Sequence, residues 1–81
     1  MAKVVIMEIK ELGLRISYVR NKANFSAREL SQMIGKGDQY ISQVEHGRIK
    51  ISVEILSLIL EVCEFPEERF FSKNIFDYDI Q

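Results

Sequence analysis

Apolar residues in the first part of the chain recur every three or four positions, a spacing that forms one stripe along a helix. The pattern predicts a helix that begins near Glu8 and ends near residues 22–24, with Asn24 suited to the turn that follows. The stripe consists of Ile9, Leu12, Ile16 and Val19. This face of the helix is expected to lie against the core.

A second helix is indicated by signals at its start. Ser26 can accept a hydrogen bond from the first backbone N–H groups, and Glu29 can bond back to close a capping box. Phe25 and Leu30 lie on either side at the spacing of a hydrophobic staple. The helix is expected to stop at Gly35, because glycine tolerates the left-handed conformation that a helix C-terminus needs.

A third helical pattern follows the glycine corner and ends at Gly47. Its apolar positions, Tyr40, Ile41 and Val44, are interleaved with polar ones at helical spacing. The two short helices are expected at about residues 27–34 and 38–46. Two such helices around a three-residue corner form a helix-turn-helix, a motif that presents one polar helix face to DNA.

Two more helices complete the expected fold. Ser52 is placed to cap a fourth helix that runs to about Cys63, and Pro66 opens a short fifth helix through residues 67–70. The side chains expected to be buried by the fourth helix are Leu56, Ile59, Leu60 and Cys63. The predicted fold class is all-α, a compact five-helix bundle.

Both termini carry patterns that also fit strands. Residues 3–7 are short and β-branched, which fits either a strand or a lead-in to the first helix. Phe76, Tyr78 and Ile80 alternate with aspartates, the period-two pattern of a half-buried strand, although a disordered terminus fits equally well. As a strand, the tail could pair two subunits. The expected division is a lead-in at 1–8, a domain at 9–71 and a dimerisation tail at 72–81.

Length and composition set further limits. Eighty-one residues make one small domain with a single core. No apolar run is long enough to span a bilayer, and no secretory signal peptide is evident, so a cytoplasmic protein is expected. The single cysteine, Cys63, excludes an internal disulfide and a multi-cysteine zinc site, and it is interpreted as a buried hydrophobic residue.

The net charge of −1 conceals an uneven distribution. Residues 12–50 carry seven Lys and Arg against three Asp and Glu, a net charge of +4, whereas residues 51–81 carry two against seven, a net charge of −5. The positive charge therefore accompanies the expected helix-turn-helix. Such an asymmetry is typical of nucleic-acid binding, although a solvated surface divided unevenly by chance would show it too.

The order and spacing of these residues resemble the Xre-type helix-turn-helix family, which includes phage-repressor-like (lambda-repressor-like) and Cro-like regulators. The resemblance covers about residues 9–71. Its motifs are Leu12-Gly13-x-Arg15-Ile16, Arg20, Ser26-x-x-Glu29-Leu30, Ile34-Gly35, Tyr40-Ile41-Ser42-Gln43-Val44-Glu45-x-Gly47 and Ser52. The sequence departs from the family at Ala27, where glutamine often holds phosphate, at Ser31, where alanine is favoured, and at Lys36 and Asp38. The resemblance implies a lambda-repressor-like DNA-binding domain, which commonly dimerises.

The third helix carries the expected base-reading residues. Gln39 and Gln43 are four apart and share one face, where each amide could donate to and accept from adenine N6 and N7. Asp38 could accept from cytosine N4, and Ser42 could bond a base or a phosphate. The resemblance supports these positions, whereas the residues alone also fit a polar face in contact with water.

Residues around the third helix are expected to contact the phosphate backbone. Long cations can reach phosphate oxygens from the flanking loops, and hydroxyl groups can donate to them. The expected contacts are Ser26, Lys36, Tyr40, His46, Arg48 and Lys50. The resemblance further implies a structural ion pair between Arg20 and Glu45, which would tie the first helix to the end of the third.

Catalysis is not expected. The sequence has no glycine-rich phosphate loop, no convincing pair of nucleophile and base, and little volume for a substrate pocket. His46 is the only histidine and has no partner ligands nearby in the sequence, so no metal site is expected. Neither a cofactor nor a small-molecule effector is expected.

Two functional hypotheses follow. The first is a sequence-specific regulator of transcription, with repression the favoured mode, that binds duplex DNA as a homodimer. The second is a protein-interaction module or antitoxin-like partner that uses the same fold with weak or no DNA binding, and it is motivated by Asp38 and the acidic C-terminal half. Salt-dependent DNA binding through Gln39 and Gln43 would separate the two.

Overall fold

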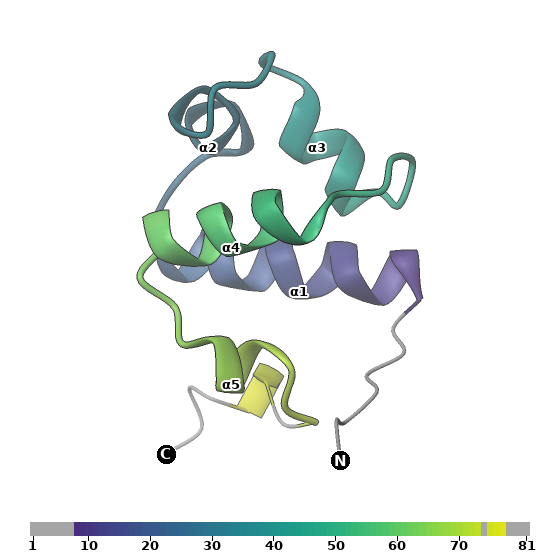
Figure 1. The fold of residues 1–81 in the computed structure, drawn as a ribbon, viewed down its shortest axis with the longest axis vertical. Helices are drawn as coiled ribbons and strands as arrows, with labels where there is room; N and C mark the ends of the chain where they lie inside the picture. The colour runs from purple at the N-terminus through teal and green to yellow at the C-terminus, as the bar shows by residue number, and fades with distance from the viewer. Residues whose placement is uncertain (1–7, 74, 78–81) are drawn as a thin grey trace.

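The computed structural model describes residues 8–73 and 75–77, and every regular element in these ranges is helical. The elements are, in order, α1 (Ile9–Lys22), α2 (Ala27–Met33), α3 (Tyr40–Glu45), α4 (Val53–Val62), α5 (Glu67–Phe70) and a 3-10 helix, η1 (Ile75–Asp77). The predicted all-α fold with five α-helices is therefore confirmed (Figure 1).

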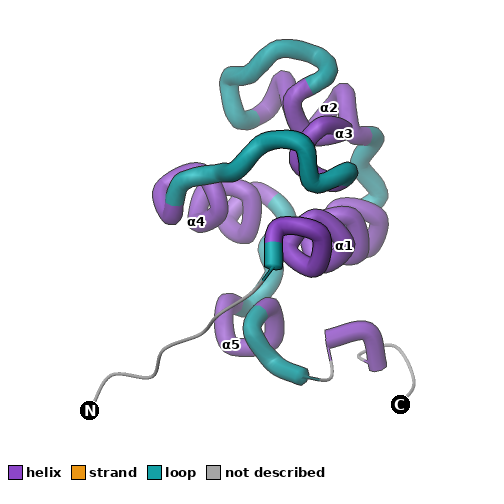
Figure 2. Tube along the Cα trace, turned by 90° about the vertical axis from the view of Figure 1, so that its right-hand side faces the viewer, coloured by secondary structure: helices purple, strands orange, loops and turns teal. Residues whose placement is uncertain are grey.

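The longest helix, α1, forms the centre of the fold. Helices α1 and α4 lie side by side, with α2 and α3 on one side of them and α5 on the other (Figures 1 and 2). Ile16 and Val19 of α1 are completely or almost completely buried, as its apolar stripe predicted. The arrangement places the α2–α3 corner at one end of the molecule, away from α5.

The core is one cluster of apolar side chains, to which each of the five α-helices and η1 contribute. Among the described residues, the buried apolar side chains are Ile16, Val19, Leu30, Ile34, Ile41, Val44, Ile59, Leu60, Phe65, Phe70 and Ile75. Leu12, Leu56 and Cys63, which the pattern placed on buried faces, are only partly buried and pack against the edge of this cluster. The core is thus smaller than the stripes predicted.

The partly buried Cys63 behaves as a hydrophobic residue. Burial raises the pKa of its thiol to about 11, although the positive charge of Arg20 acts in the opposite direction. The thiol therefore stays protonated at neutral pH, when a reactive cysteine would need to be ionised.

The helix boundaries differ from the expected ones at α3. This helix begins at Tyr40 rather than at Asp38, because residues 38 and 39 form a turn in which the Tyr40 N–H donates to the Gly37 carbonyl at 3.0 Å. His46, expected to be helical, is the C-cap. By contrast, α2 and α4 start after Ser26 and Ser52 as predicted, and both serine hydroxyls accept a backbone N–H.

The C-terminal strand prediction is wrong where the structure tests it. Phe76 lies in the 3-10 helix η1, and its ring packs edge-on against Tyr18 of α1 with centroids 5.5 Å apart. The preceding Ile75 is buried in the core, so this segment folds back onto α1 instead of extending. Tyr78 and Ile80 of the predicted strand, like residues 3–7, lie outside the described residues.

Two general features bear on function. No described helix is both long and apolar enough to cross a membrane. Within residues 8–73 and 75–77, no three His, Cys, Asp or Glu side chains lie close enough together to hold a metal ion.

Candidate nucleic-acid interface

The corner between α2 and α3 is fixed by backbone bonds. Gly35 has a φ of +77°, the left-handed conformation expected at the end of α2. Its N–H donates to the Gln32 carbonyl at 3.0 Å, and the Lys36 N–H donates to the Ser31 carbonyl at 2.8 Å. These bonds satisfy the last carbonyls of α2 and turn the chain sharply toward α3.

The start of α2 carries the predicted capping box. The Ser26 hydroxyl accepts from the Glu29 N–H at 3.0 Å, and the Ser26 N–H donates to the Glu29 carboxylate at 2.8 Å. The hydroxyl proton of Ser26 is not used in this box. Ser26 can therefore cap the helix and still donate to a phosphate oxygen.

A buried serine joins α2 to α3. The Ser31 hydroxyl donates to the Ala27 carbonyl at 2.7 Å and accepts from the Ile41 N–H at 3.0 Å, and the residue is fully buried. Gln39, at the N-cap position of α3, makes no cap bond with its side chain. Ser31 thus caps α3 from the neighbouring helix. The sequence showed only that serine stands here where the family favours alanine, and it did not indicate this role.

Three of the expected base-reading residues, Gln39, Ser42 and Gln43, lie at the start of α3 and along it. Gln39 and Gln43 are exposed and one turn apart, since the Gln43 N–H donates to the Gln39 carbonyl at 3.0 Å, and Ser42 between them is half-buried. Gln39 precedes the first turn of α3, where residues of a recognition helix contact base edges. A polar face beginning at a helix N-terminus is suited to the major groove.

The comparisons with known proteins agree with this geometry. Residues 16–70 match the HTH_3 family, described as helix-turn-helix. The chain belongs to this helix-turn-helix family. The membership covers most of the chain and places it among DNA-binding domains rather than enzymes. No curated protein sequence matches the chain.

One solved structure resembles the whole domain. It is the crystal structure of the clp gene regulator ClgR from C. glutamicum, which superposes with a TM-score of 0.73 at 20% sequence identity. The similarity covers 86% of this chain and 90% of that one. At this identity the likeness establishes a shared fold.

The helix-turn-helix is anchored to α1 by the expected partners, Arg20 and Glu45. The Arg20 guanidinium donates from Nε to Glu45 Oε2 at 2.6 Å and from Nη2 to Oε1 at 3.1 Å. Its Nη1 donates to the Phe25 carbonyl at 2.7 Å. The bond to Glu45 raises the pKa of Arg20, although burial acts to lower it. Only 15% and 10% of the two side chains remain exposed.

Helix α1 also approaches the end of α3 at Gly13. A Cβ atom at this position would lie 2.5 Å from the Glu45 carbonyl oxygen and 2.8 Å from that of Val44. No real Cβ contact is that short, so only glycine permits this approach. The absence of a side chain at Gly13 therefore sets the distance between α1 and α3.

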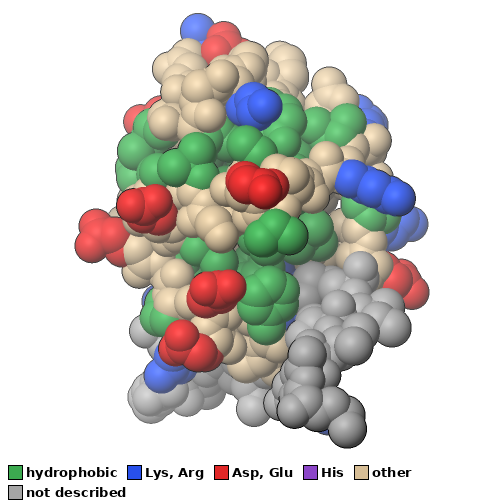
Figure 3. Space-filling model, in the orientation of Figure 1, with side chains coloured by type: hydrophobic (Ala, Val, Ile, Leu, Met, Phe, Trp, Pro, Cys, Tyr) green, Lys and Arg blue, Asp and Glu red, His purple; other side chains and the backbone are tan. Residues whose placement is uncertain are grey.

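The cations around the helix-turn-helix are not equivalent. Lys36, Arg48 and Lys50 are exposed and form no ion pair with any residue in 8–73 or 75–77. The Lys36 ammonium lies 5.2 Å from the centre of the Tyr40 ring, which places both predicted phosphate contacts together. In Figure 3, lysines and arginines appear at the end formed by α2, α3 and the following loop, with a few acids among them, while most of the visible acids lie over α4 and α5.

His46 is constrained by its own helix. Its Nδ1 lies 2.7 Å from the Ser42 carbonyl oxygen, which can only accept, so Nδ1 carries a proton. A neutral ring would then present a lone pair at Nε2, which cannot donate to phosphate. The expected phosphate contact through the ring therefore requires the imidazolium form.

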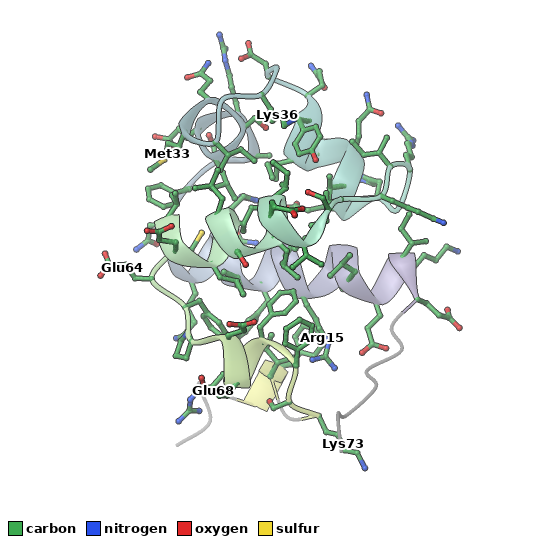
Figure 4. All side chains as sticks on the ribbon, viewed as in Figure 1. Arg15, Met33, Lys36, Glu64, Glu68 and Lys73 are labelled. Atoms are coloured by element: carbon green, nitrogen blue, oxygen red, sulfur yellow. The ribbon has the colours of Figure 1, made fainter. Side chains whose placement is uncertain are left out.

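Sequence reasoning missed the role of Arg15, which entered only as part of the family motif and of the positive charge. Arg15 is buried, donates to the Phe70 and Ser72 carbonyls at 2.6 and 2.7 Å, and pairs with Glu11 at 2.7 Å. Figure 4 shows it between α1 and the segment after α5. Arg15 thus holds α5 against α1 and contributes little charge to the interface.

Asp38, a predicted base-reading residue, has partners that the sequence did not indicate. Its Oδ1 accepts from Gln32 Nε2 at 2.9 Å, and its Oδ2 lies 3.2 Å from Arg28 Nε. Both partners belong to α2. The carboxylate is therefore paired with side chains of the preceding helix.

Proposed function

We propose that the protein is a sequence-specific transcriptional regulator that represses by occupying a partly palindromic operator as a homodimer. The observation that carries the proposal is the polar face of Gln39, Ser42 and Gln43, flanked by Lys36, Arg48 and Lys50, which are exposed and form no ion pair within the described residues. Family membership and the ClgR-like fold support it. The proposal places the protein in the cytoplasm, with duplex DNA and a second copy of the chain as its partners.

Each side chain has a distinct role in this proposal. The two glutamine amides read base edges, each as a donor and acceptor pair matching adenine. The hydroxyls of Ser26 and Tyr40, the three cations and protonated His46 contact phosphates, which fixes the register of α3 in the groove. Two copies related by a two-fold axis would read half-sites about one DNA turn apart.

The first experiment is selection of binding sites from a random duplex DNA library at moderate salt. The expected result is a two-fold symmetric motif, and a double variant with Gln39→Ala and Gln43→Ala should lose selectivity at defined positions of it. Retained selectivity in this variant would show that the readout assignment is wrong. Light scattering of the free protein and of its complex with the selected site measures whether two copies bind.

A matched pair of lysines tests the phosphate contacts. Lys36 lies beside the corner, whereas Lys73 lies at the opposite end of the molecule (Figure 4). Lys36→Ala and Lys50→Ala should each weaken binding to every sequence alike and reduce the slope of log K against log salt by about 0.9 per lost contact. Lys73→Ala should leave affinity and slope unchanged. A loss at one base position only would refute the phosphate role.

The alternative is a protein-interaction module with the same fold, for example an antitoxin-like partner. Its remaining support is the acidic surface over α4 and α5 (Figure 3). Asp38, which also motivated it, lends less support because its carboxylate is paired with Arg28. No enriched DNA motif, from protein shown by circular dichroism to be folded, would favour this alternative over the regulator.

A further inference from the structure

We propose that Arg28, on α2, is a specificity-determining residue that reads guanine, and that Asp38 acts as its positioning residue rather than as a base reader. This inference rests on the proposed function. It starts from a three-residue cluster in which Arg28 and Gln32, one turn apart on α2, converge on the Asp38 carboxylate.

The cluster brings α2 chemistry to the start of α3. Asp38 lies in the turn immediately before α3, beside the residues from which a recognition helix contacts base edges. Arg28 Nε lies 3.2 Å from Asp38 Oδ2, so the guanidinium is held at this point and not over the body of α2. A residue of the supporting helix therefore extends the reading surface of α3.

The geometry leaves the useful part of the guanidinium available. Its Nε is used by Asp38, and the four N–H groups of Nη1 and Nη2 remain as a planar fork. The Arg28 side chain is 71% exposed, and among residues 8–73 and 75–77 its only ion-pair partner is Asp38, through Nε. Such a fork matches the O6 and N7 acceptors of guanine, the commonest specific contact of arginine in the major groove.

The pair has little purpose as a structural element. Ion pairs at the surface contribute little to stability, and this one is largely exposed, with 47% of the Asp38 side chain also exposed. A carboxylate near phosphates repels them and lowers affinity, so its presence calls for a compensating role. Limiting the rotamers of a long arginine side chain before DNA binds is such a role, because less conformational entropy of the side chain is then lost on binding.

The same contacts argue against direct reading by Asp38. One oxygen accepts the Gln32 amide and the other faces Arg28, so the carboxylate is engaged on both oxygens before DNA binds. Contacting cytosine N4 would require it to release or share these partners. Orienting Arg28 requires no rearrangement.

The test is site selection followed by competition binding with Arg28→Ala, Arg28→Lys, Asp38→Ala and the double alanine variant. Arg28→Ala should remove a guanine preference at one position of each half-site, a loss of about 5- to 150-fold against other bases. Arg28→Lys should not restore it, because lysine lacks the fork. Asp38→Ala should weaken the preference at the same position, and the double variant should lose no more than Arg28→Ala alone.

Each other outcome overturns the proposal in its own way. Loss of selectivity at a different position in Asp38→Ala would make Asp38 a reader. Uniform weakening in Arg28→Ala that Arg28→Lys restores would make Arg28 a phosphate contact, and uniform strengthening in Asp38→Ala would mean that Asp38 masks a cation. An enriched motif that none of the variants alters would refute this inference alone. No enriched motif for the folded wild-type protein would refute the proposed function as well.

Discussion

The two ends of α3 are each joined to another helix by an arginine and a carboxylate, yet the two pairs differ in burial. At the C-terminal end, Arg20 of α1 meets Glu45 with side chains 15% and 10% exposed. Before the N-terminal end, Arg28 of α2 meets Asp38 with side chains 71% and 47% exposed. We refer to these as the inner pair and the outer pair. The comparison shows that the same two charged groups are largely dehydrated within the fold in one pair and hydrated at its surface in the other.

Burial explains this division of roles. Each charge in the inner pair regains little water when its partner is removed, because only 15% of the Arg20 side chain and 10% of the Glu45 side chain are exposed. The outer pair exchanges protein contacts for water at little cost. The inner pair is also reinforced by the close approach at Gly13, whereas a Cβ at Gly37, next to the outer pair in the chain, would meet nothing within 4 Å.

The largest expected effect is the loss of one inner partner. Glu45→Ala leaves Arg20 buried without its carboxylate and should lower the free energy of unfolding by about 3–5 kcal/mol, measured by urea denaturation. Asp38→Ala is the matched control for the outer pair and should cost less than about 1 kcal/mol. Equal losses in the two variants would remove the distinction between the pairs. If Glu45→Ala does not fold, replacing both Arg20 and Glu45 by apolar residues should recover a folded protein.

Gly13→Ala tests the contact that accompanies the inner pair. Because its Cβ would overlap the Glu45 carbonyl, α1 and α3 must separate, and we expect a cost of about 1–3 kcal/mol in the free energy of unfolding. Gly37→Ala is the control, since a Cβ there meets nothing within 4 Å. Similar melting temperatures for the two variants would contradict a tight α1–α3 contact.

Ser31→Ala tests whether the Ser31 hydroxyl, and not the outer pair, holds the N-terminal end of α3. The substitution removes the acceptor of the buried Ile41 N–H and should cost about 1–2 kcal/mol, more than Asp38→Ala. Ser57→Ala, at an exposed position of α4, controls for the gain in helix propensity that alanine brings. A neutral Ser31→Ala would mean that the outer pair, not the serine, holds this end.

The smallest effect is the coupling energy within the outer pair. A double-mutant cycle of Arg28→Ala and Asp38→Ala should give between about 0 and 1 kcal/mol at low salt and a value near zero at about 1 M salt, where screening is short-ranged. The corresponding cycle for Arg20 and Glu45 should change little with salt, because burial limits screening. Salt-insensitive coupling in the outer pair would show that it is dehydrated after all.

Local signals made much of the fold predictable. The capping box of Ser26 and Glu29 depends on residues three apart, and the left-handed corner depends on Gly35 itself, so both follow from short stretches of sequence. The exposed face of Gln39 and Gln43 follows from helical spacing. The inner pair could be anticipated only through the family resemblance, because its partners are 25 positions apart in the sequence.

Contacts between distant or non-periodic positions could not be predicted. Arg15 bonds the Phe70 carbonyl 55 positions later, and no local pattern marks an arginine that will be buried. Ser31 is one small polar residue within a helix, where spacing gives no indication of a bond to Ile41. The alternation around Phe76 indicated a strand, but packing against Tyr18 and burial of Ile75 outweighed the period-two pattern.

The hydroxyl of Ser31 has a consequence for how such a protein can change its target. An N-cap position ordinarily restricts the residue there to serine, threonine, aspartate or asparagine, because the helix needs that side chain. Here the Ile41 N–H is satisfied from α2, and Gln39 at the N-cap is released from this duty. Position 39 can therefore accept many side chains without loss of the helix. Under the proposed function, a lineage could exchange one operator for another by substitution at this site while its fold stayed unaltered.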